Sequence, residues 1–293
     1  MKLTLDQIRA VAWGAARCEE KNGAVKLYRF TQEQEDIYEA YDAVLYRKTF
    51  STAGIKLVFR TDSESLFIKV NTSLGASQKF FSFDLFVDGE LRDSLDNYSD
   101  VDLPKNYSNY DLPLGEYSKK FSLKKGEKEL KLYFPWSVNV DVLEISLDDG
   151  ARIIPVRADK KMISFGDSIT HGYHSLRSYN RYAGRLSEAL GAEEFCKAIG
   201  AERFFPELAA AKDNFDPDYI TVAYGTNDWC VFEREVGEEK CRAFFKELVD
   251  NYPNTKIFAI TPIWRKDWEK TKKFGRFSDM ENLIKETVNV IGQ

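Results

Sequence analysis

The chain has 293 residues, 43 % of them hydrophobic and 30 % charged, which is typical of a globular protein and favours two domains. Its net charge is −5 and no cluster of Lys and Arg stands out, so a nucleic-acid partner is disfavoured. The densest basic spot, Lys119-Lys120 and Lys124-Lys125, is interpreted as a solvated hairpin loop. No stretch approaches the ~20 apolar residues that span a bilayer, and the N-terminus lacks the apolar core of a signal peptide, so no membrane partner is expected.

Residues 1–156 predict a β-rich domain. A short helical pattern comes first, because Leu5, Ile8 and Val11 recur at helical spacing. Seven segments with alternating apolar residues follow: Ala43–Phe50, Ile55–Thr61, Leu66–Val70, Phe80–Val87, Tyr117–Leu123, Glu129–Phe134 and Val140–Leu147. Short strands at this spacing indicate a β-sandwich or jelly roll. The polar stretch Asp93–Gly115 is expected to form a long loop.

Residues 160–293, after a short charged connector, predict an α/β domain. The predicted strands are Met162–Phe165, Glu194–Ile199, Tyr219–Tyr224 and Lys256–Thr261. The predicted helices lie near Leu176–Leu190, Phe205–Ala211, Glu238–Tyr252 and Ser278–Ile291. Alternating strands and helices imply a parallel sheet with helices on both faces. We expect a flavodoxin-like, three-layer arrangement.

The four cysteines show no C-x-x-C spacing: Cys18, Cys196, Cys230 and Cys241. Their pattern predicts reduced, mostly buried thiols in a cytoplasmic protein and disfavours a zinc site. No sequence motif calls for a cofactor, because neither a G-x-x-x-x-G-K-[ST] nor a G-x-G-x-x-G motif is present.

The most informative residue is Ser168, in the turn that follows the strand Met162–Phe165. A serine at this position lies at the carboxyl edge of a sheet, where α/β folds bind their ligands. Such a hydroxyl can act as a nucleophile if a base accepts its proton. Gly166-Asp167-Ser168-Ile169-Thr170 is not G-x-S-x-G, so an α/β-hydrolase elbow is disfavoured.

Two further groups follow the next strands and are expected in the same crevice. Gly200 and Ala201 follow the second strand, and Asn227 follows the third. Backbone N–H groups at the first turn and the amide of Asn227 are donors that can hold the oxyanion of an acyl-transfer reaction. The sequence therefore predicts a serine-dependent acyl-transfer site.

These segments resemble those of the SGNH (GDSL-type) hydrolases. Phe165-Gly166-Asp167-Ser168-Ile169-Thr170 is similar to the first block of this family, and Gly225-Thr226-Asn227-Asp228 to the third. The β-rich first half, with Leu132-Tyr133-Phe134-Pro135-Trp136-Ser137, is similar to the jelly roll of bipartite carbohydrate esterases of this clan. The resemblance implies a cofactor-free serine esterase that hydrolyses small acyl esters, acetyl groups in particular, of an oligosaccharide or other small molecule through an acyl-serine intermediate. It assigns Ser168 as the nucleophile and Asn227 as an oxyanion donor.

The second block departs from the family pattern. Its usual asparagine is replaced by Cys196, and its usual oxyanion glycine by Ala201. A backbone N–H needs no particular side chain, so Ala201 can serve if its φ is ordinary. Gly200 is the other candidate.

The family's C-terminal Asp-x-x-His block, which supplies the base, is absent from these 293 residues. We expect a complete domain to need another strand, the Asp/His loop and a helix, roughly 40 residues. His171 lies three residues after Ser168 and within reach of it, but the sequence offers no third group to orient its ring. Two alternatives therefore stay open: a saccharide-binding relative without activity, or a shortened form of a longer active esterase.

Three aromatic residues near the strand ends are candidates for substrate binding. Trp229 and Trp264 follow the third and fourth strands, and either stacking on a sugar or core packing would explain them. Tyr173 lies on the loop after the nucleophile. The apolar strand around Ile257–Ile260 would form an unpaired sheet edge, which predicts a homo-oligomer or another cover for this edge.

Overall fold

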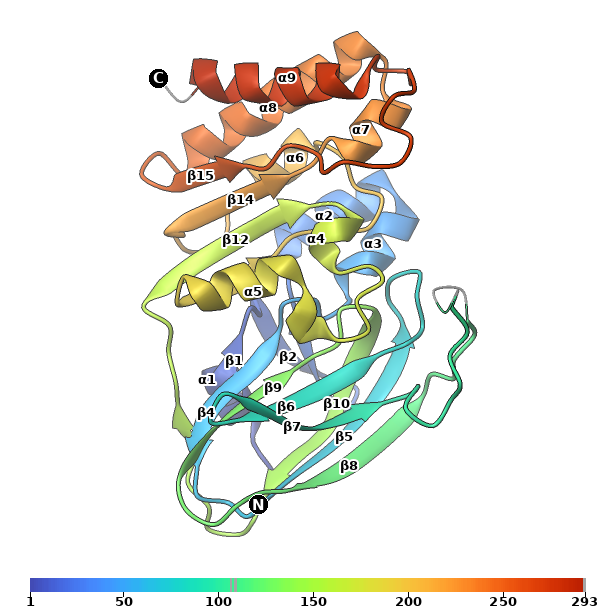
Figure 1. Ribbon diagram of the computed structural model, residues 1–293. Helices are drawn as coiled ribbons and strands as arrows, with labels where there is room; N and C mark the ends of the chain where they lie inside the picture. Colours follow the sequence, from blue (N-terminus) through green and yellow to red (C-terminus); the bar gives the residue numbers. More distant parts are fainter. Residues whose placement is uncertain (106, 108–109, 292–293) are drawn as a thin grey trace.

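The computed structural model describes residues 1–105, 107 and 110–291. Two antiparallel sheets occupy the lower half of the molecule in Figure 1, and a parallel sheet with helices occupies the upper half. None of the helices in the described ranges has both the length and the apolar character that crossing a bilayer requires.

The first 155 residues fold mainly as a β-sandwich. Its elements are α1 (Leu5–Val11), β1 (Ala12–Trp13), β2 (Arg17–Lys21), β3 (Ala24–Tyr28), α2 (Gln32–Tyr41), α3 (Ala43–Thr49), β4 (Lys56–Thr61), β5 (Ser65–Leu74), β6 (Ser82–Val87), β7 (Glu90–Asp96), β8 (Glu116–Ser122), β9 (Lys128–Tyr133), β10 (Val138–Leu147) and β11 (Ile154–Pro155). One sheet has the order β2-β3-β10-β5-β8, and the other has the order β1-β4-β9-β6-β7 with β11 beside β4.

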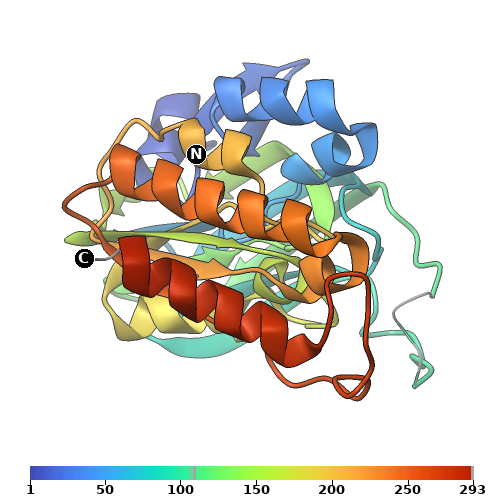
Figure 2. The same ribbon diagram turned by 90° about the horizontal axis from the view of Figure 1, so that it is seen from above.

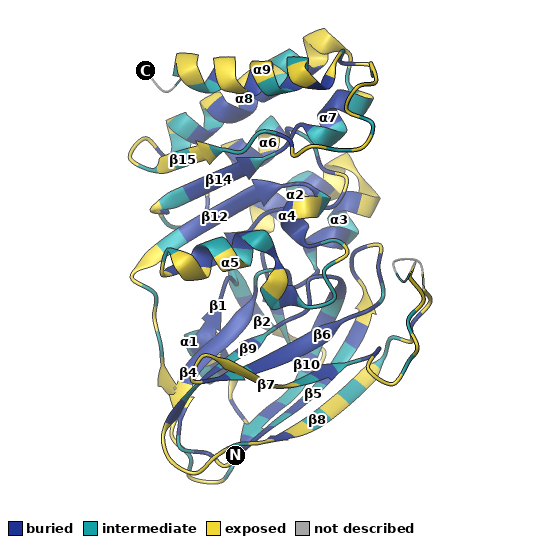
Figure 3. Cartoon of the chain, in the orientation of Figure 1, coloured by how far each residue is buried: buried dark blue, intermediate teal, exposed yellow. Residues whose placement is uncertain are grey.

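One apolar core fills the space between the two sheets. Leu57 and Phe83 come from one sheet, and Ile68 and Val140 from the other, and all four belong to the same buried cluster. Burial alternates along β9 and most of β5, and Figure 3 shows exposed and less exposed residues in turn along β8. This alternation is expected of a strand with one face on the core. The predicted β-sandwich is confirmed.

The predicted strand Ala43–Phe50 is wrong, because these residues form helix α3. The helix begins where the carboxylate of Asp42 accepts hydrogen bonds from the backbone N–H groups of Val44 (2.7 Å) and Leu45 (2.9 Å). Helix α2 was not predicted either, although Thr31 and Gln34 form a capping box at its start. The other six predicted strands are present, with ends shifted by a few residues, and β7 takes the beginning of the predicted loop Asp93–Gly115.

Helices α2 and α3 pack against the upper half of the molecule. Tyr38 of α2 and Leu45 of α3 belong to the same buried cluster as Ile163 and Phe244, which lie in the α/β part. The β-rich part of the sequence therefore contributes side chains to the core of the α/β part. The division into residues 1–156 and 160–293 stays a prediction.

The α/β part contains β12 (Lys160–Gly166), α4 (Ser168–His171), a 3-10 turn (Ser178–Asn180), α5 (Tyr182–Ala189), β13 (Ala192–Cys196), α6 (Pro206–Ala210), β14 (Tyr219–Ala223), α7 (Thr226–Val231), α8 (Arg234–Asn251), β15 (Lys256–Ala259) and α9 (Phe277–Ile291). The sheet order is β13-β12-β14-β15, and every pair is parallel. Figure 2 shows α5 and α8 on opposite faces of this sheet. The predicted flavodoxin-like α/β arrangement is confirmed.

Strand β15 is the outermost strand of this sheet among the described residues. It pairs with β14 through the register Ile220↔Ile257, and α9 packs near it. The side chain of Phe258, on the other face, is 50 % exposed. The end of the sheet near β15 is therefore only partly covered.

Candidate active site

Ser168 is held at the carboxyl end of β12 by a capped turn. The carboxylate of Asp167 accepts a hydrogen bond from the backbone N–H of Ile169 at 2.9 Å, so Asp167 rather than Ser168 is the N-cap of α4. A Cβ at Gly166 would overlap the side chain of Thr170, so only glycine fits before the turn. Ser168 is partly exposed, and within the described residues its hydroxyl makes no hydrogen bond. Its hydroxyl is therefore accessible and has no evident structural function.

Asn227 lies in the first turn of α7, which follows β14 at the same edge of the sheet. Asp228 fixes this turn, because its two carboxylate oxygens accept the backbone N–H groups of Phe204 and Gly225, each at 2.9 Å. The side-chain amide of Asn227 donates one hydrogen bond to the carbonyl of Glu202 at 2.9 Å. An amide NH₂ has two donors, so the second remains for a ligand.

Gly200 cannot offer its backbone N–H to an oxyanion in this structure. That N–H donates to Nδ1 of His171 at 3.1 Å, and the carbonyl of Gly200 accepts from Lys48 Nζ at 2.6 Å. A Cβ at this position would overlap the ring of Tyr173. Gly200 is therefore fixed and tightly packed in the loop after β13. The interpretation of Gly200 as an oxyanion donor is wrong for this structure.

Ala201 is the remaining backbone candidate in this loop. Its φ is +74°, in the left-handed region, so the condition of an ordinary φ is not met. A non-glycine residue in this region is strained by roughly 1 kcal/mol or more. Ala201 is exposed, and no acceptor for its N–H occurs in the described parts of the chain. The strain and the unpaired N–H occur together where the family places an oxyanion glycine.

His171 is buried and saturated with hydrogen bonds. Its Nε2 lies 3.0 Å from the carbonyl of Trp136 and 2.9 Å from the hydroxyl of Ser51. A carbonyl only accepts, so we assign the ring proton to Nε2, and Nδ1 then accepts the N–H of Gly200. Burial, together with nearby Arg29 and Arg181, lowers the pKa of His171 well below its ordinary value. Neither nitrogen is available to take a proton from Ser168.

His174 is tied to the β-sandwich instead of the serine. Its Nδ1 lies 3.1 Å from Nε2 of Gln78, its backbone N–H donates to Oε1 of Gln78, and its carbonyl accepts from Tyr107. The chain has two histidines. No histidine partner of Ser168 is thus found in the part of the chain that the structure describes.

Comparison with known families agrees with this geometry. Residues 164–287 match the family described as "GDSL-like Lipase/Acylhydrolase family", which spans the serine turn and the Asn227 turn. Over these residues the chain is therefore similar to GDSL-like acylhydrolases, and we refer to this part as the GDSL-like domain. No curated protein matches the chain.

Solved structures share the fold of most or all of the chain at low sequence identity. The salicylyl-acyltransferase SsfX3 from a tetracycline biosynthetic pathway is 19 % identical, with a TM-score of 0.79 over 96 % of this chain and 78 % of that one. A GDSL-like lipase from Bacteroides ovatus is 19 % identical, with a TM-score of 0.73 over 100 % and 83 %. A family two carbohydrate esterase from Clostridium thermocellum, in complex with cellohexaose, is 14 % identical, with a TM-score of 0.61 over 83 % and 79 %.

The three aromatic candidates of the GDSL-like domain lie in different surroundings. Trp229 is fully buried, and its indole N–H donates to the carbonyl of Gly275 at 2.8 Å. Its ring therefore packs in the core, where a sugar cannot reach it. Trp264 is 70 % exposed. The partly buried ring of Tyr173 packs on Trp136, with 4.9 Å between ring centroids. Core packing therefore explains Trp229, whereas Trp264 and Tyr173 remain candidates.

A buried polar network that the sequence did not reveal holds the second block of the GDSL-like domain. The guanidinium of Arg29, from the β-rich half, donates to the carbonyls of Cys196 (2.9 Å) and Ala198 (3.0 Å). Arg181 pairs with Glu194 at 2.9 Å and lies 3.1 Å from the sulfur of Cys196. Cys196, at the family's asparagine position, is thus enclosed by two cations. The spacing of these residues in sequence carries no signal, since they meet only in the folded chain.

Three buried carboxyl groups lie behind the serine. Burial raises the pKa of Asp167 to about 6, that of Asp228 to about 6 and that of Glu202 to about 7. One carboxylate oxygen of Glu202 has no hydrogen-bond partner within the described chain, and neither has the hydroxyl of buried Tyr38 beside it. Part of this group is therefore uncharged near neutral pH.

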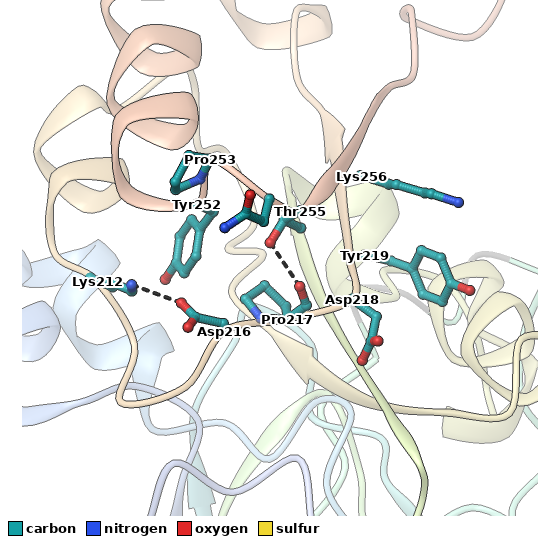
Figure 4. A pocket seen from close by; sticks show the side chains of 10 residues that line it. Lys212, Asp216, Pro217, Asp218, Tyr219, Tyr252, Pro253, Thr255 and Lys256 are labelled. Atoms are coloured by element: carbon teal, nitrogen blue, oxygen red, sulfur yellow. Dashed lines mark hydrogen bonds and ion pairs between the residues drawn. The ribbon is translucent and has the colours of Figure 1, made fainter.

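The hollow of about 500 Å³ in Figure 4 is not part of the serine site. It is lined by residues at the start of β14 and β15, among them Tyr219 and Lys256, and by the ion pair Lys212–Asp216. These strands are parallel, so their first residues lie at the amino edge of the sheet, opposite the edge of Ser168.

Proposed function

We propose that the protein is a serine esterase that removes small acyl groups, acetyl in particular, from a carbohydrate. The observation that carries this proposal is the unbonded, accessible hydroxyl of Ser168 at the carboxyl edge of the sheet. The match of residues 164–287 to an acylhydrolase family supports the reaction class. The carbohydrate rests on the shared fold with carbohydrate esterases, which is weaker support for a substrate.

In the proposed reaction, the hydroxyl oxygen of Ser168 bonds to the ester carbonyl carbon. The oxyanion is held by the second N–H of the Asn227 amide and by the backbone N–H groups of Ala201 and Ser168, none of which donates to an acceptor among the described residues. The bond to the sugar oxygen then breaks, and the sugar leaves with the proton lost by the serine. Water repeats the attack on the acyl-serine and releases the acid.

The rate depends on what accepts the proton of Ser168. A serine without a base has almost no alkoxide at neutral pH, so we expect very slow turnover of p-nitrophenyl acetate by these 293 residues. Addition of a C-terminal Asp/His segment should increase the rate strongly. Ordinary enzyme rates that vanish in His171→Ala would show instead that His171 is the base.

The proposal is tested with Ser168→Ala. Release of acetate from acetylated oligosaccharide should fall by about 10³-fold or more, provided that the measured rate exceeds that of the solvent. The melting temperature should stay unchanged, because the hydroxyl of Ser168 makes no hydrogen bond. A fluorophosphonate at high concentration should add one covalent label to the native chain, slowly because no base activates the serine, and none to the variant. Retained activity, or labelling elsewhere, would contradict the proposal.

A saccharide-binding relative without activity is the alternative to this proposal. It predicts that both the native chain and Ser168→Ala bind acetylated oligosaccharide, measured by calorimetry, and that neither releases acetate even at high enzyme concentration.

A further inference from the structure

The loop that joins β15 to α9 has an unusual composition. We call residues 263–276 the basic loop: they contain six basic and two acidic residues, a local charge of +4 in a chain whose net charge is −5. The basic residues occur singly or in pairs that other residues separate, so the segment contains no run of three or more consecutive Lys and Arg. The basic residues are Arg265, Lys266, Lys270, Lys272, Lys273 and Arg276.

Most of this charge is not neutralised within the described chain. Arg265 and Lys272 share the carboxylate of Asp267, at 2.6 and 3.3 Å. By contrast, Lys266, Lys270, Lys273 and Arg276 are exposed, and none of them forms an ion pair with any described carboxylate. The other acid of the loop, Glu269, is also exposed, and Asp279 nearby is paired with Arg234.

The same loop exposes two indole rings. Trp264 is 70 % exposed and Trp268 is 43 % exposed, whereas Trp136 and Trp229 are fully buried. A large exposed apolar side chain can contact a ligand without giving up any contact within the protein. The flat face of an indole can pack on the apolar face of a sugar. Cations and accessible indoles thus alternate along one segment.

The basic loop is fastened to the helix that carries Asn227. The indole N–H of Trp229 in α7 donates to the carbonyl of Gly275, and Arg265 reaches the carbonyl of Thr226 at 3.4 Å. Arg265 is also close enough to Asp167, beside the serine, to lower its pKa against the larger effect of burial. Figure 1 shows the loop beside α7, at the end of the sheet where α4 follows β12. The loop therefore borders the serine site.

We propose that the basic loop binds an acidic polysaccharide, with carboxylate groups on its sugars, and presents its ester to Ser168. This inference rests on the proposed function and specifies its substrate class. Charge complementarity favours such a partner over a second copy of the chain, because two loops of charge +4 would repel each other. The carboxylate of Asp267, between the two indoles, and that of Glu269, directly after Trp268, disfavour insertion of the loop into a lipid headgroup layer.

The test measures binding with Ser168→Ala, so that it does not depend on turnover. The probe is polygalacturonate, and its methyl-esterified form is the neutral polymer of the same sugar. We expect the anionic form to bind at least about tenfold more tightly in low salt, and this preference to disappear in 0.5 M NaCl. Equal affinity for the two polymers would overturn the inference.

A triple variant locates the site. K266E/K270E/K273E should weaken binding of polygalacturonate by about tenfold or more, while K120E/K124E/K125E, which changes the same charge on exposed lysines of the β-sandwich, should weaken it by less than about twofold. Equal losses in both variants would show an effect of net charge alone. Binding to vesicles with 30 % phosphatidylserine, without binding to polygalacturonate, would identify a membrane surface instead.

Acetate release separates this inference from the proposed function. If Ser168→Ala binds polygalacturonate through the basic loop but the native chain releases no acetate from its acetylated form, only the esterase proposal fails. If the native chain deacetylates neutral xylan and polygalacturonate equally well, and the K266E/K270E/K273E variant does the same, only the acidic substrate class fails.

Discussion

The carboxyl ends of β12 and β14 and the outer strand β15 belong to one sheet, yet they are built differently. Around Ser168 and Asn227, capping carboxylates and tightly packed glycines fix each turn, and the unbonded groups are the serine hydroxyl and a few N–H groups. Around β15, an apolar side chain and several cations are left uncovered. A rigid frame around a few free polar groups is typical of a reaction site, whereas broad uncovered surface indicates contact with a larger partner.

Gly200→Ala is expected to have the largest effect on the rigid region. The added methyl group would overlap the ring of Tyr173, which cannot move without disturbing Trp136. We expect a loss of about 3 kcal/mol in the free energy of unfolding, measured with urea. The double variant Gly200→Ala/Tyr173→Ala should recover part of this loss relative to Tyr173→Ala alone. Full stability of Gly200→Ala would show that the loop after β13 is looser than described.

Glu202→Gln should change how stability depends on pH. The pKa of Glu202 is raised by burial from 4.5 to about 7, so the folded state favours the neutral acid. This contribution is fully present below pH 4.5 and is lost as pH rises through 7, by up to about 3 kcal/mol.

We therefore expect the native chain to lose stability between pH 4.5 and 7, and the Glu202→Gln variant to lose less. Melting curves across this range measure it. A weaker decline in stability should remain in the variant, since the pKa values of Asp167 and Asp228 are also raised by burial. Parallel pH profiles for the two proteins would be inconsistent with a buried, neutral Glu202.

Ala201→Gly should increase the stability of the protein, because glycine adopts the left-handed φ of +74° without strain. We expect a gain of about 0.5–1 kcal/mol in stability and an unchanged or slightly lower rate of ester hydrolysis. The same substitution at Ala243, inside helix α8, serves as the control and should destabilise by a similar amount. A loss of stability in Ala201→Gly would contradict the strained backbone.

Phe258→Lys tests the uncovered region and should have the smallest effect on folding. The side chain is half exposed, so we expect a change of less than about 0.5 kcal/mol in stability, against about 2–5 kcal/mol for Ile220→Ala in the buried neighbour strand. If β15 mediates self-association, the variant should also reduce the mass measured by light scattering. A monomeric native chain whose 256–261 amides exchange rapidly would show that this edge needs no cover.

The fold was predictable where periodicity and turns are local. The β12–β15 strands and most sandwich strands follow from apolar runs of the right length, and helix α1 was predicted with its core residues. Ala43–Phe50 failed because its alternation also fits a helix, and the decisive signal was the cap at Asp42. Local pattern cannot arbitrate between these two structures when the run is only eight residues long.

The site was predictable only in part. Ser168 and Asn227 follow strands whose carboxyl ends must meet, so their shared edge of the sheet follows from topology. The loss of Gly200 as a donor could not be predicted, because it depends on a hydrogen bond to His171. That ring is oriented in turn by Trp136 and Ser51, more than thirty residues away in sequence. Long-range side-chain contacts of this kind leave no trace in spacing.

The packing of α2 and α3 on the α/β core has a consequence for how the chain folds. Phe30, Tyr38 and Leu45 precede most of the sandwich in sequence but complete the core around Ile163. The α/β half cannot complete its apolar core until these residues are present, so it should fold and unfold together with the segment that carries them. If the gene were divided between its β-rich and α/β halves, the α/β polypeptide should recover its structure only when the β-rich polypeptide is added.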